Sequence, residues 1–503
     1  MRMIKFQYSM PSFQFKGFFY TLLATGYLLL VSCGVTKQIS KSAEQSVIND
    51  SSLVNAHIGI SIYEPKIGKY WYNYNGEKYF VPASNTKIPT CYAAMKYLGD
   101  SLVGLKYGLI EETSYSNKLV AIHPTGDPTF LHSDFKYQPV YEFFKKELGN
   151  ERIEICYMDT VWKDERWGSG WSWNDYEEPY MAERSSFPIY GNTINVKLHE
   201  VNDRILEKKT GFSSGKIQLF KTGSVYFDSI LNKIPLIQVY NHDVVKSPKF
   251  KLELQRSIDG NNFSIKTLQT NLVEQNITFD TKWSTTALDI LKSEFKINWG
   301  FLFRGKNNEY WHECDTRHDY PITLHINKWN IIHSQPTDSL LKPMMHRSDN
   351  FFAEQSLLMV SNEMLGVMND AKIIDTLLKT DFKDLPQKPR WVDGSGLSRY
   401  NLFTPQDFVA ILGKMEKEFG MNRIKEIFAT GGEGTISSYY KSDSGFIYAK
   451  TGTLSGVVAL SGFLTTKKGK QLLFSVLVNN HNGSATAVRR AVEKFIQGIR
   501  NTY

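Results

Sequence analysis

The chain has 503 residues, of which 42% are hydrophobic and 22% are charged, and its formal net charge is +8. This length exceeds what one compact core supports, so two or more domains are expected. The positive charge favours anionic surfaces such as cell-wall polymer or lipid. No dense Lys/Arg block interleaved with aromatic residues is present in the sequence, which argues against a nucleic-acid-binding protein.

The N-terminus has the pattern of a secretory signal. Basic residues, the last of them Lys16, precede an apolar run over residues 17–32, and Cys33 follows directly. This run is shorter than the roughly 20 residues that span a bilayer, so a cleaved signal over residues 1–32 is favoured over a transmembrane helix. The ending Leu30-Val31-Ser32-Cys33 resembles a bacterial lipobox, which implies lipidation of Cys33 and a periplasmic protein anchored to a membrane. The alternative is an ordinary signal peptide with a chance cysteine.

Beyond the signal, residues 33–54 are polar and Ser-rich and are expected to form a tether. Three further cysteines follow, Cys91, Cys156 and Cys314. Because their number is odd, they cannot all be paired within a disulfide framework. One pair could form in an oxidising periplasm, and the sequence does not choose it. Cys91 lies among apolar residues and is expected to be buried packing.

The first folded elements expected are two strands and a helix. Residues 57–63 and 70–74 alternate apolar and polar side chains, with a turn between them. A helix follows Ser84 and ends at Gly99. Pro89 lies in the early turns of this helix, which leaves its first residue open.

Residues 105–280 differ in character and are expected to form one or two inserted, mostly β domains. Trp and Tyr are frequent there, as in residues 167–173, and the pair Asp259-Gly260 predicts a turn. The strand-like runs are residues 216–220, 224–227, 235–240, 249–254 and 262–268.

Helices dominate the segment after the insertion, and three strands and a helix close the chain. The expected helices are residues 286–295, 340–345, 350–365, 404–419, 423–428 and 485–499. The expected strands are residues 446–450, 457–464 and 471–479. Strands near both ends with helices between them predict an α+β fold in which residues 55–104 and 281–503 build one antiparallel sheet.

The candidate nucleophile is Ser84, in the segment Pro82-Ala83-Ser84-Asn85-Thr86-Lys87. A serine and a lysine three residues apart share one face of a helix, and a desolvated lysine with a lowered pKa can take the proton of the hydroxyl. Alone the pattern is weak, because it recurs elsewhere in the chain. The other copies are Ser133/Lys136, Ser213/Lys216, Ser293/Lys296, Ser339/Lys342 and Ser438/Lys441.

Two later motifs single out Ser84. Ser348-Asp349-Asn350 and then Lys450-Thr451-Gly452-Thr453 follow it, an order typical of β-lactamases and penicillin-binding proteins. The latter motif continues a strand-like run, whose edge can pair with the backbone of a ligand, and its glycine leaves room for close approach. The copies Lys209-Thr210-Gly211 and Lys221-Thr222-Gly223 lie in the inserted region, without the flanking helix.

At these motifs the sequence resembles the class C low-molecular-mass penicillin-binding proteins, which are D-alanyl-D-alanine carboxypeptidases and endopeptidases. The resemblance runs from about Asn55 to the C-terminus. It implies a β-lactamase/transpeptidase-like domain, an antiparallel sheet with helices on both faces, that carries a large insertion between its first and second motifs. Its other specific segments are residues 125–129, 392–399, 432–435 and 449–454, and residues 170–175 match it more loosely.

The resemblance implies catalytic roles for four side chains, Ser84, Lys87, Ser348 and Lys450. Ser84 would attack the carbonyl carbon between two D-alanines and form an acyl-enzyme, and neutral Lys87 would take its proton. Ser348 and Lys450 would pass a proton to the leaving amine. No cofactor is implied, and β-lactams, which mimic the D-Ala-D-Ala bond, would trap Ser84.

Substrate-binding roles are implied for Asn350, Thr451, Gly452 and Thr453. Asn350 would hydrogen-bond the amide of the substrate, and Thr451 would bind its terminal carboxylate. The backbone N–H groups of Ser84 and Thr453 would form an oxyanion hole. The implied partners are the stem peptides of peptidoglycan.

Three polar clusters have purely structural interpretations as well. Asp349 either caps the following helix or contacts substrate, and residues 393–396 are expected to be a tight turn. His312 and His318 flank Glu313-Cys314 without the i, i+4 spacing of a helical zinc pair, so no metal site is predicted.

The leading hypothesis is therefore a periplasmic, lipid-anchored serine DD-peptidase. A β-lactamase is the second hypothesis, but the Glu-x-x-Leu-Asn sequence with which class A enzymes deacylate does not occur downstream of Asn350. The third is a non-catalytic wall-binding or β-lactam-sensing module. A sensor needs a transmembrane signalling segment, and the sequence after Cys33 contains none.

Overall fold

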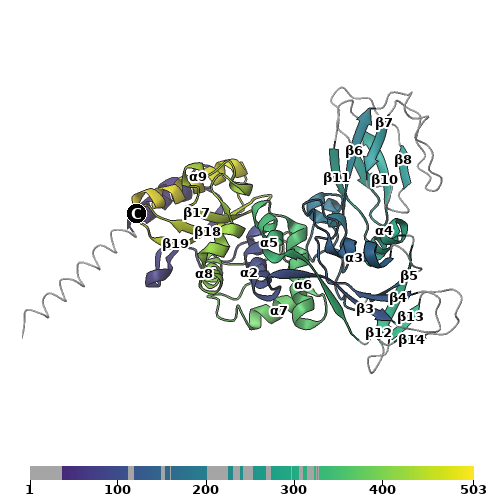
Figure 1. Cartoon of the computed structure of the whole chain (residues 1–503). Coiled ribbons are helices and arrows are strands. Elements are labelled where there is room, and N and C mark those ends of the chain that lie inside the picture. The colour runs from purple at the N-terminus through teal and green to yellow at the C-terminus, as the bar shows by residue number, and fades with distance from the viewer. Residues whose placement is uncertain are drawn as a thin grey trace, which may run out of the picture.

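The structure, a computed structural model, describes residues 37–110, 118–148, 153–158, 160–200, 225–229, 238–241, 253–267, 274–295, 297–304, 310–313, 322–324, 326 and 328–503. The molecule is elongated (Figure 1). Strands from both ends of the chain lie at one end of it, and helices fill its middle. The strands from the middle of the chain lie at the other end.

A six-stranded antiparallel sheet forms the first end, with the strand order β16-β17-β18-β19-β1-β2. Its strands are β1 (His57–Glu64), β2 (Lys69–Tyr74), β16 (Ala429–Thr430), β17 (Ile447–Leu454), β18 (Val457–Thr465) and β19 (Gln471–Asn479). β1 pairs with β19, with Ser61 opposite Ser475. Segments from both ends of the chain thus share one sheet, which confirms the predicted α+β fold.

Both faces of this sheet are covered by helices, and the sequence of β19 shows why. Successive side chains of a strand point to opposite faces. Phe474 lies in the core beneath α9 (Ala485–Thr502), whereas Leu473 lies in the core that contains α8 (Pro405–Ile427). Because both faces are buried, this strand is an almost uninterrupted apolar run instead of an alternating one.

Helices in the middle of the molecule extend the core that contains α8. They are α2 (Lys87–Tyr97), α5 (Thr337–His346), α6 (Asn350–Leu365) and α7 (Asp370–Lys379). α2 packs against α5, α6 and α8, so the helix that follows Ser84 is held on several sides. The two helices predicted for residues 404–428 lie within α8, which is kinked at Gly420, where φ is 74° and ψ is 155°.

Residues 37–48 are helical and end in a π-helical turn, which differs from the tether predicted for residues 33–54. Ile39, Ala43 and Val47 recur every four residues, so they share one helix face. All three are buried in the core beneath α9. The polar residues between them masked this apolar stripe in the sequence.

The inserted region is built on a seven-stranded mixed sheet of order β14-β13-β12-β5-β4-β3-β15. Its strands are β3 (Ser101–Ile110), β4 (Lys118–His123), β5 (Ile153–Met158), β12 (Asn298–Arg304), β13 (Tyr310–Glu313), β14 (Ile322–Leu324) and β15 (Asn330–Pro336), and α3 (Pro139–Leu148) and α4 (Thr285–Phe295) pack on it. β3 pairs with β15, so the insertion extends to Pro336. The predicted insertion, residues 105–280, is therefore too short, because the closing strand pair joins segments far apart in the sequence.

Two three-stranded sheets form the outer part of the insertion (Figure 1). Their strands are β6 (Thr193–Glu200), β7 (Val225–Ser229) and β11 (Glu274–Thr278) in one sheet, and β8 (Gln238–Asn241), β9 (Glu253–Arg256) and β10 (Asn262–Thr267) in the other. The predicted strand at residues 216–220 lies outside the described residues. The same holds for the signal segment with Cys33 and for the two Lys-Thr-Gly copies of this region.

Candidate active site

Ser84 lies on a short 3-10 turn, Ala83–Thr86, that leads directly into α2. Pro89 is the third residue of α2, where the missing N–H removes no intrahelical hydrogen bond. The helix start that the sequence left open is therefore Lys87. This arrangement places the lysine one turn after the serine, and Lys87 Nζ lies 3.0 Å from Ser84 Oγ.

Lys87 is fully buried and has three hydrogen-bond acceptors around its ammonium group. Besides Ser84 Oγ, Nζ donates to Asn350 Oδ1 at 2.6 Å and to the carbonyl oxygen of Ser395 at 2.7 Å. Burial lowers the pKa of Lys87 to about 8, although the negative charge of Asp393 opposes the shift. A lysine in this state is neutral far more often than an exposed one, which suits a proton acceptor.

Ser348 and Lys450 form a second serine–lysine pair. Lys450 Nζ donates to Ser348 Oγ at 2.8 Å and to the carbonyl oxygen of Thr451 at 2.8 Å. Burial, and then the charge of Lys87, lowers the pKa of Lys450 well below its usual value. Ser348 has a φ of 64°, an uncommon conformation for a side-chain-bearing residue that is often found at functional sites.

Asn350 joins the first pair to the insertion. Its Oδ1 accepts from Lys87, and its Nδ2 donates to the carbonyl oxygen of Tyr180 at 2.9 Å. The neighbouring Asp349 caps α6, because its carboxylate accepts from the backbone N–H of Phe352 at 3.0 Å. Of the two interpretations of Asp349, the capping role is thus confirmed.

β17 carries the Lys-Thr-Gly motif along a free strand edge. β16 pairs with it only at Tyr448 and Ala449, and no other described strand covers its outer edge from Lys450 onward. At Gly452 a Cβ would lie 2.5 Å from the carbonyl oxygen of Pro82, so only glycine lets β17 approach the turn that holds Ser84. Such an edge can accept a peptide as an added strand.

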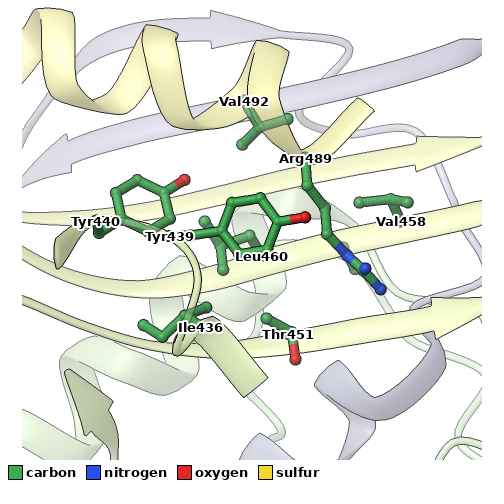
Figure 2. Close-up of a pocket in the computed structure, with 9 residues that line it drawn as sticks. Ile436, Tyr439, Tyr440, Thr451, Val458, Leu460, Arg489 and Val492 are labelled. Carbon is green, nitrogen blue, oxygen red and sulfur yellow. The ribbon is translucent and has the colours of Figure 1, made fainter. Parts of the chain in front are cut away.

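A small pocket lies beside this edge, between α9 and the strands (Figure 2). Thr451 lines it at β17, and Arg489 lines it from α9. The other lining residues, most of them apolar, are Ile436, Tyr439, Tyr440, Val458, Ala459, Leu460 and Val492. Thr451 Oγ1 also donates to Thr435 Oγ1 at 2.7 Å, so its hydroxyl is held in place.

The segment Asp393–Gly396 does more than form the tight turn that the sequence predicted. Its Ser395 carbonyl oxygen accepts from Lys87. Asp393 accepts from the backbone N–H groups of Gly396 at 2.8 Å and Ser398 at 2.7 Å, and from Trp171 Nε1 at 2.9 Å. Gly396 has a φ of 86°, and a Cβ there would lie 1.9 Å from the carbonyl oxygen of Ala83, in the turn that holds Ser84. The carboxylate of Asp393 therefore shapes the loop that positions Lys87.

Arg184 of the insertion is fully buried beside this loop, and sequence reasoning missed it. It forms ion pairs with Asp164 at 2.8 Å, Asp370 at 2.7 Å and Glu354 at 3.4 Å. Glu354 in turn accepts from the backbone N–H of Ser395 at 2.7 Å, and burial raises its pKa to about 7. Nothing in the local sequence around Arg184 distinguishes it from a surface arginine, because its three partners come from distant segments.

The structure thus brings together five of the predicted side chains, Ser84, Lys87, Ser348, Asn350 and Lys450, and places Thr451, Gly452 and Thr453 on the adjoining strand. Within the described ranges, no group of three or more His, Cys, Asp or Glu side chains is arranged to hold a metal ion. Cys91 and Cys156 are both buried free thiols, which confirms Cys91 as packing. Cys314 and His318 lie outside the described residues.

The fold and the clustered motifs define the class of protein, a serine peptidase of the penicillin-binding type. The model of the D-Ala-D-Ala carboxypeptidase 3 (S13) family matches residues 41–228 and 330–501, and the chain belongs to this family. The chain is thus a low-molecular-mass class C penicillin-binding protein and a serine D-Ala-D-Ala peptidase, as the sequence motifs indicated.

Relatives of similar length support this placement. The D-alanyl-D-alanine carboxypeptidase DacB of Haemophilus influenzae is 25% identical over 452 residues, which cover 86% of this chain and 87% of that protein. A D-alanyl-D-alanine carboxypeptidase of an Actinomadura species is 23% identical over 497 residues, with 94% and 87% covered. The crystal structure of penicillin binding protein 4 from Haemophilus influenzae has the same fold, with a TM-score of 0.66 at 21% identity over 92% of this chain and 98% of that one.

Proposed function

We propose that this peptidase acts through an acyl-enzyme on Ser84. It would cleave the terminal D-Ala-D-Ala bond of peptidoglycan, the D-Ala cross-link bond, or both. The observation that carries the proposal is the pairing of two serines with two buried lysines. Lys87 Nζ lies 3.0 Å from Ser84 Oγ, and Lys450 Nζ lies 2.8 Å from Ser348 Oγ. Each lysine is poised to exchange a proton with a hydroxyl group.

In the proposed first step, Ser84 Oγ attacks the scissile carbonyl carbon while its proton moves to neutral Lys87. The carbonyl oxygen becomes an oxyanion, which the backbone N–H groups of Ser84 and Thr453 would bind; each such donor contributes roughly 3 kcal/mol in other hydrolases. The tetrahedral intermediate then breaks the bond to nitrogen. Ser348, backed by Lys450, donates the proton that the leaving amine needs.

Water then hydrolyses the acyl-enzyme, which restores the Ser84 hydroxyl and frees the shortened peptide. Asn350, which hydrogen-bonds Lys87 and the Tyr180 carbonyl oxygen of the insertion, would bind the amide of the stem peptide. The free edge of β17 would hold the peptide backbone as an added strand.

β-Lactams are proposed as inhibitors that acylate the same serine. The crystal structure of the Haemophilus influenzae penicillin binding protein 4 in complex with a novel β-lactam supports this, at 20% identity and a TM-score of 0.62. Because the chain lacks the Glu-x-x-Leu-Asn sequence of class A β-lactamases, the acyl group should leave slowly. Rapid turnover of nitrocefin by the purified protein would instead favour the β-lactamase hypothesis.

We further propose that the protein works in the periplasm, attached to a membrane by a lipid on Cys33. The basis is the sequence of the N-terminal segment; in the described part of the chain, no helix has the length and apolar character of a membrane span. Metabolic labelling with a radioactive fatty acid should mark the wild-type protein and leave the variant Cys33→Ser unmarked. Equal labelling of both proteins would refute lipidation at Cys33.

The test of the enzymatic proposal is mass spectrometry of the products from a purified pentapeptide and from cross-linked muropeptides. Wild-type protein should release D-alanine or separate the cross-linked peptides, and the variant Ser84→Ala should do neither. Penicillin binding without any product would overturn the proposed activity and favour a β-lactam-binding module. The ratio of the two products assigns the carboxypeptidase and endopeptidase shares.

A further inference from the structure

Ser348 is the single residue that joins two helices at the site. Arg347 ends α5, and its backbone N–H donates to the carbonyl oxygen of Pro343 at 3.0 Å. Asp349 caps the start of α6. Ser348 lies between these caps with a φ of 64°, a conformation that side-chain-bearing residues rarely adopt, so neighbouring contacts must maintain it. The direction of its hydroxyl toward Lys450 depends on this backbone conformation.

The side chain of Arg347 spans this link. Its Nη2 donates to Asp134 Oδ2 of the insertion and lies 3.8 Å from Asp349 Oδ2. Arg347 precedes Ser348 and Asp349 follows it. The guanidinium therefore connects the residues on both sides of Ser348 to each other and to the insertion.

The loop that carries Asp134 is held against the same helix. The backbone N–H of Asp134 donates to His132 Nδ1 at 3.2 Å. The ring of His132 packs against Phe352 in the first turn of α6, with ring centroids 4.9 Å apart, and the ring of Phe135 lies 6.2 Å from that of Phe352. Phe352 also supplies the backbone N–H that Asp349 accepts. The insertion thus reaches this segment through packed rings as well as through an ion pair.

Stability alone does not explain the contact between Arg347 and Asp134. Their side chains are 51% and 29% exposed, and ion pairs at such positions add little to the free energy of folding. Proton transfer, in contrast, needs atoms at hydrogen-bond distance, such as the 2.8 Å between Lys450 Nζ and Ser348 Oγ. A small displacement of Ser348 is therefore expected to change the reaction more than it changes stability.

We propose that Arg347 and Asp134 are positioning residues that hold the Ser348 hydroxyl where it protonates the leaving nitrogen. This inference rests on the proposed function and gives the insertion a part in its proton transfer. Both residues act through Ser348. Their contribution should therefore depend on how much the leaving group needs a proton.

Two kinds of leaving group differ in this need. When the bond from the carbonyl carbon to nitrogen breaks, its electron pair goes to nitrogen, and the amine leaves only if nitrogen receives a proton. When the corresponding bond to sulfur breaks, the electron pair goes to sulfur, and a thiolate is stable as an anion near neutral pH. Loss of the positioning contact should therefore slow cleavage of an amide selectively.

The test compares an N-acylated D-Ala-D-Ala peptide with its thioester counterpart, in which sulfur replaces the scissile N–H. Both substrates form the same acyl-enzyme, so the ratio of their kcat/KM values isolates the departure of the leaving group. Arg347→Gln and Asp134→Asn should each lower the amide-to-thioester ratio by about threefold to tenfold, as expected for a lost charged hydrogen bond that is partly exposed.

Three further variants make the result specific. Arg347→Lys keeps a cation between the two carboxylates and should retain a ratio closer to that of wild-type protein. Asp375→Asn removes a carboxylate from the exposed ion pair with Lys379 on α7, and this matched control should keep the wild-type ratio. In the double variant Arg347→Gln/Asp134→Asn the two losses should not add, because both residues act through one contact.

The outcomes separate this inference from the function on which it rests. A wild-type protein that cleaves neither substrate, or a Ser348→Ala variant with the wild-type ratio, overturns the proposed function or its acid step, and this inference with it. A ratio that falls in Ser348→Ala but not in Arg347→Gln and Asp134→Asn overturns the positioning role alone, as do equal losses for both substrates. A selective loss for the amide at an unchanged melting temperature supports the role.

Discussion

The pH dependence of acylation by penicillin follows directly from the environment of Lys87. With a pKa of about 8, the fraction of Lys87 that is neutral is roughly 1% at pH 6, roughly 10% at pH 7 and roughly 50% at pH 8. At the unperturbed pKa of 10.5 the neutral fraction at pH 7 would be only about 0.03%. If neutral Lys87 is the base, the second-order rate constant should rise about tenfold from pH 6 to 7 and about fivefold from pH 7 to 8, and then level off.

A charge removal tests the cause of this profile. The negative charge of Glu354 raises the pKa of Lys87, so Glu354→Gln should shift the midpoint to lower pH. The glutamine keeps an acceptor for the backbone N–H of Ser395, which limits structural damage. Asp349→Asn, which retains a helix cap, should shift the midpoint in the same direction by less.

The assay is the rate of labelling by a fluorescent penicillin across pH 6 to 10, with the melting temperature recorded at each pH. A rate that is constant from pH 6 to 9 would refute Lys87 as the base. So would a rate that continues to rise tenfold per unit up to pH 10, because that profile belongs to a lysine with an ordinary pKa.

Three further substitutions test other parts of the site. Gly396→Ala should slow acylation severely, because its Cβ would displace the turn that holds Ser84. The control Gly445→Ala, also at positive φ but with open space around it, should lower the free energy of unfolding by only about 1–2 kcal/mol and acylate normally. Equal acylation by both variants would contradict the argument that Gly396 permits a close approach. Arg184→Met leaves three carboxylates without their cation and should lower the free energy of unfolding by roughly 3–5 kcal/mol in a denaturant titration, an effect that a surface ion pair would not produce. Asn350→Ala removes an acceptor from Lys87 and should reduce acylation without loss of the melting temperature; wild-type labelling kinetics would show that this contact is dispensable.

The insertion contributes to the site as well as extending from it. Trp171, Tyr180 and Arg184 each contact a residue of the catalytic domain, at Asp393, Asn350 and Glu354 respectively. These contacts connect the loop of Asp393 and the helix α6 to the segment between residues 160 and 200. The geometry around Lys87 therefore depends on both parts of the chain.

The serine and lysine side chains that the structure brings together could be predicted from sequence, because the proposed chemistry demands fixed residue types at short spacings within each motif. Ser84 and Lys87, for example, are one helical turn apart. The apolar run of β19 likewise predicts that both faces of this strand are buried. The contacts of Arg184, Ser395 and Arg489 could not be predicted in this way. Each contacts a partner that is distant in the sequence, and only the folded chain brings the two together.

The boundaries of the insertion and the N-terminal helix were missed for related reasons. The pairing of β3 with β15 closes the seven-stranded sheet across a long segment, and strand partners at such separation leave no local signal. The stripe of Ile39, Ala43 and Val47 is short, and it acquires meaning only because α9 lies against it. Local periodicity identifies elements, whereas the surfaces that they cover depend on the whole fold.

The central claim is that Ser84 is the residue acylated. Intact-protein mass spectrometry after incubation with benzylpenicillin, followed by peptide mapping, tests it most directly. We predict a mass increase equal to one antibiotic molecule, located on the peptide that contains Ser84, and no increase in the folded variant Ser84→Ala. An adduct on any other residue, or an adduct that persists in Ser84→Ala, would contradict the assignment.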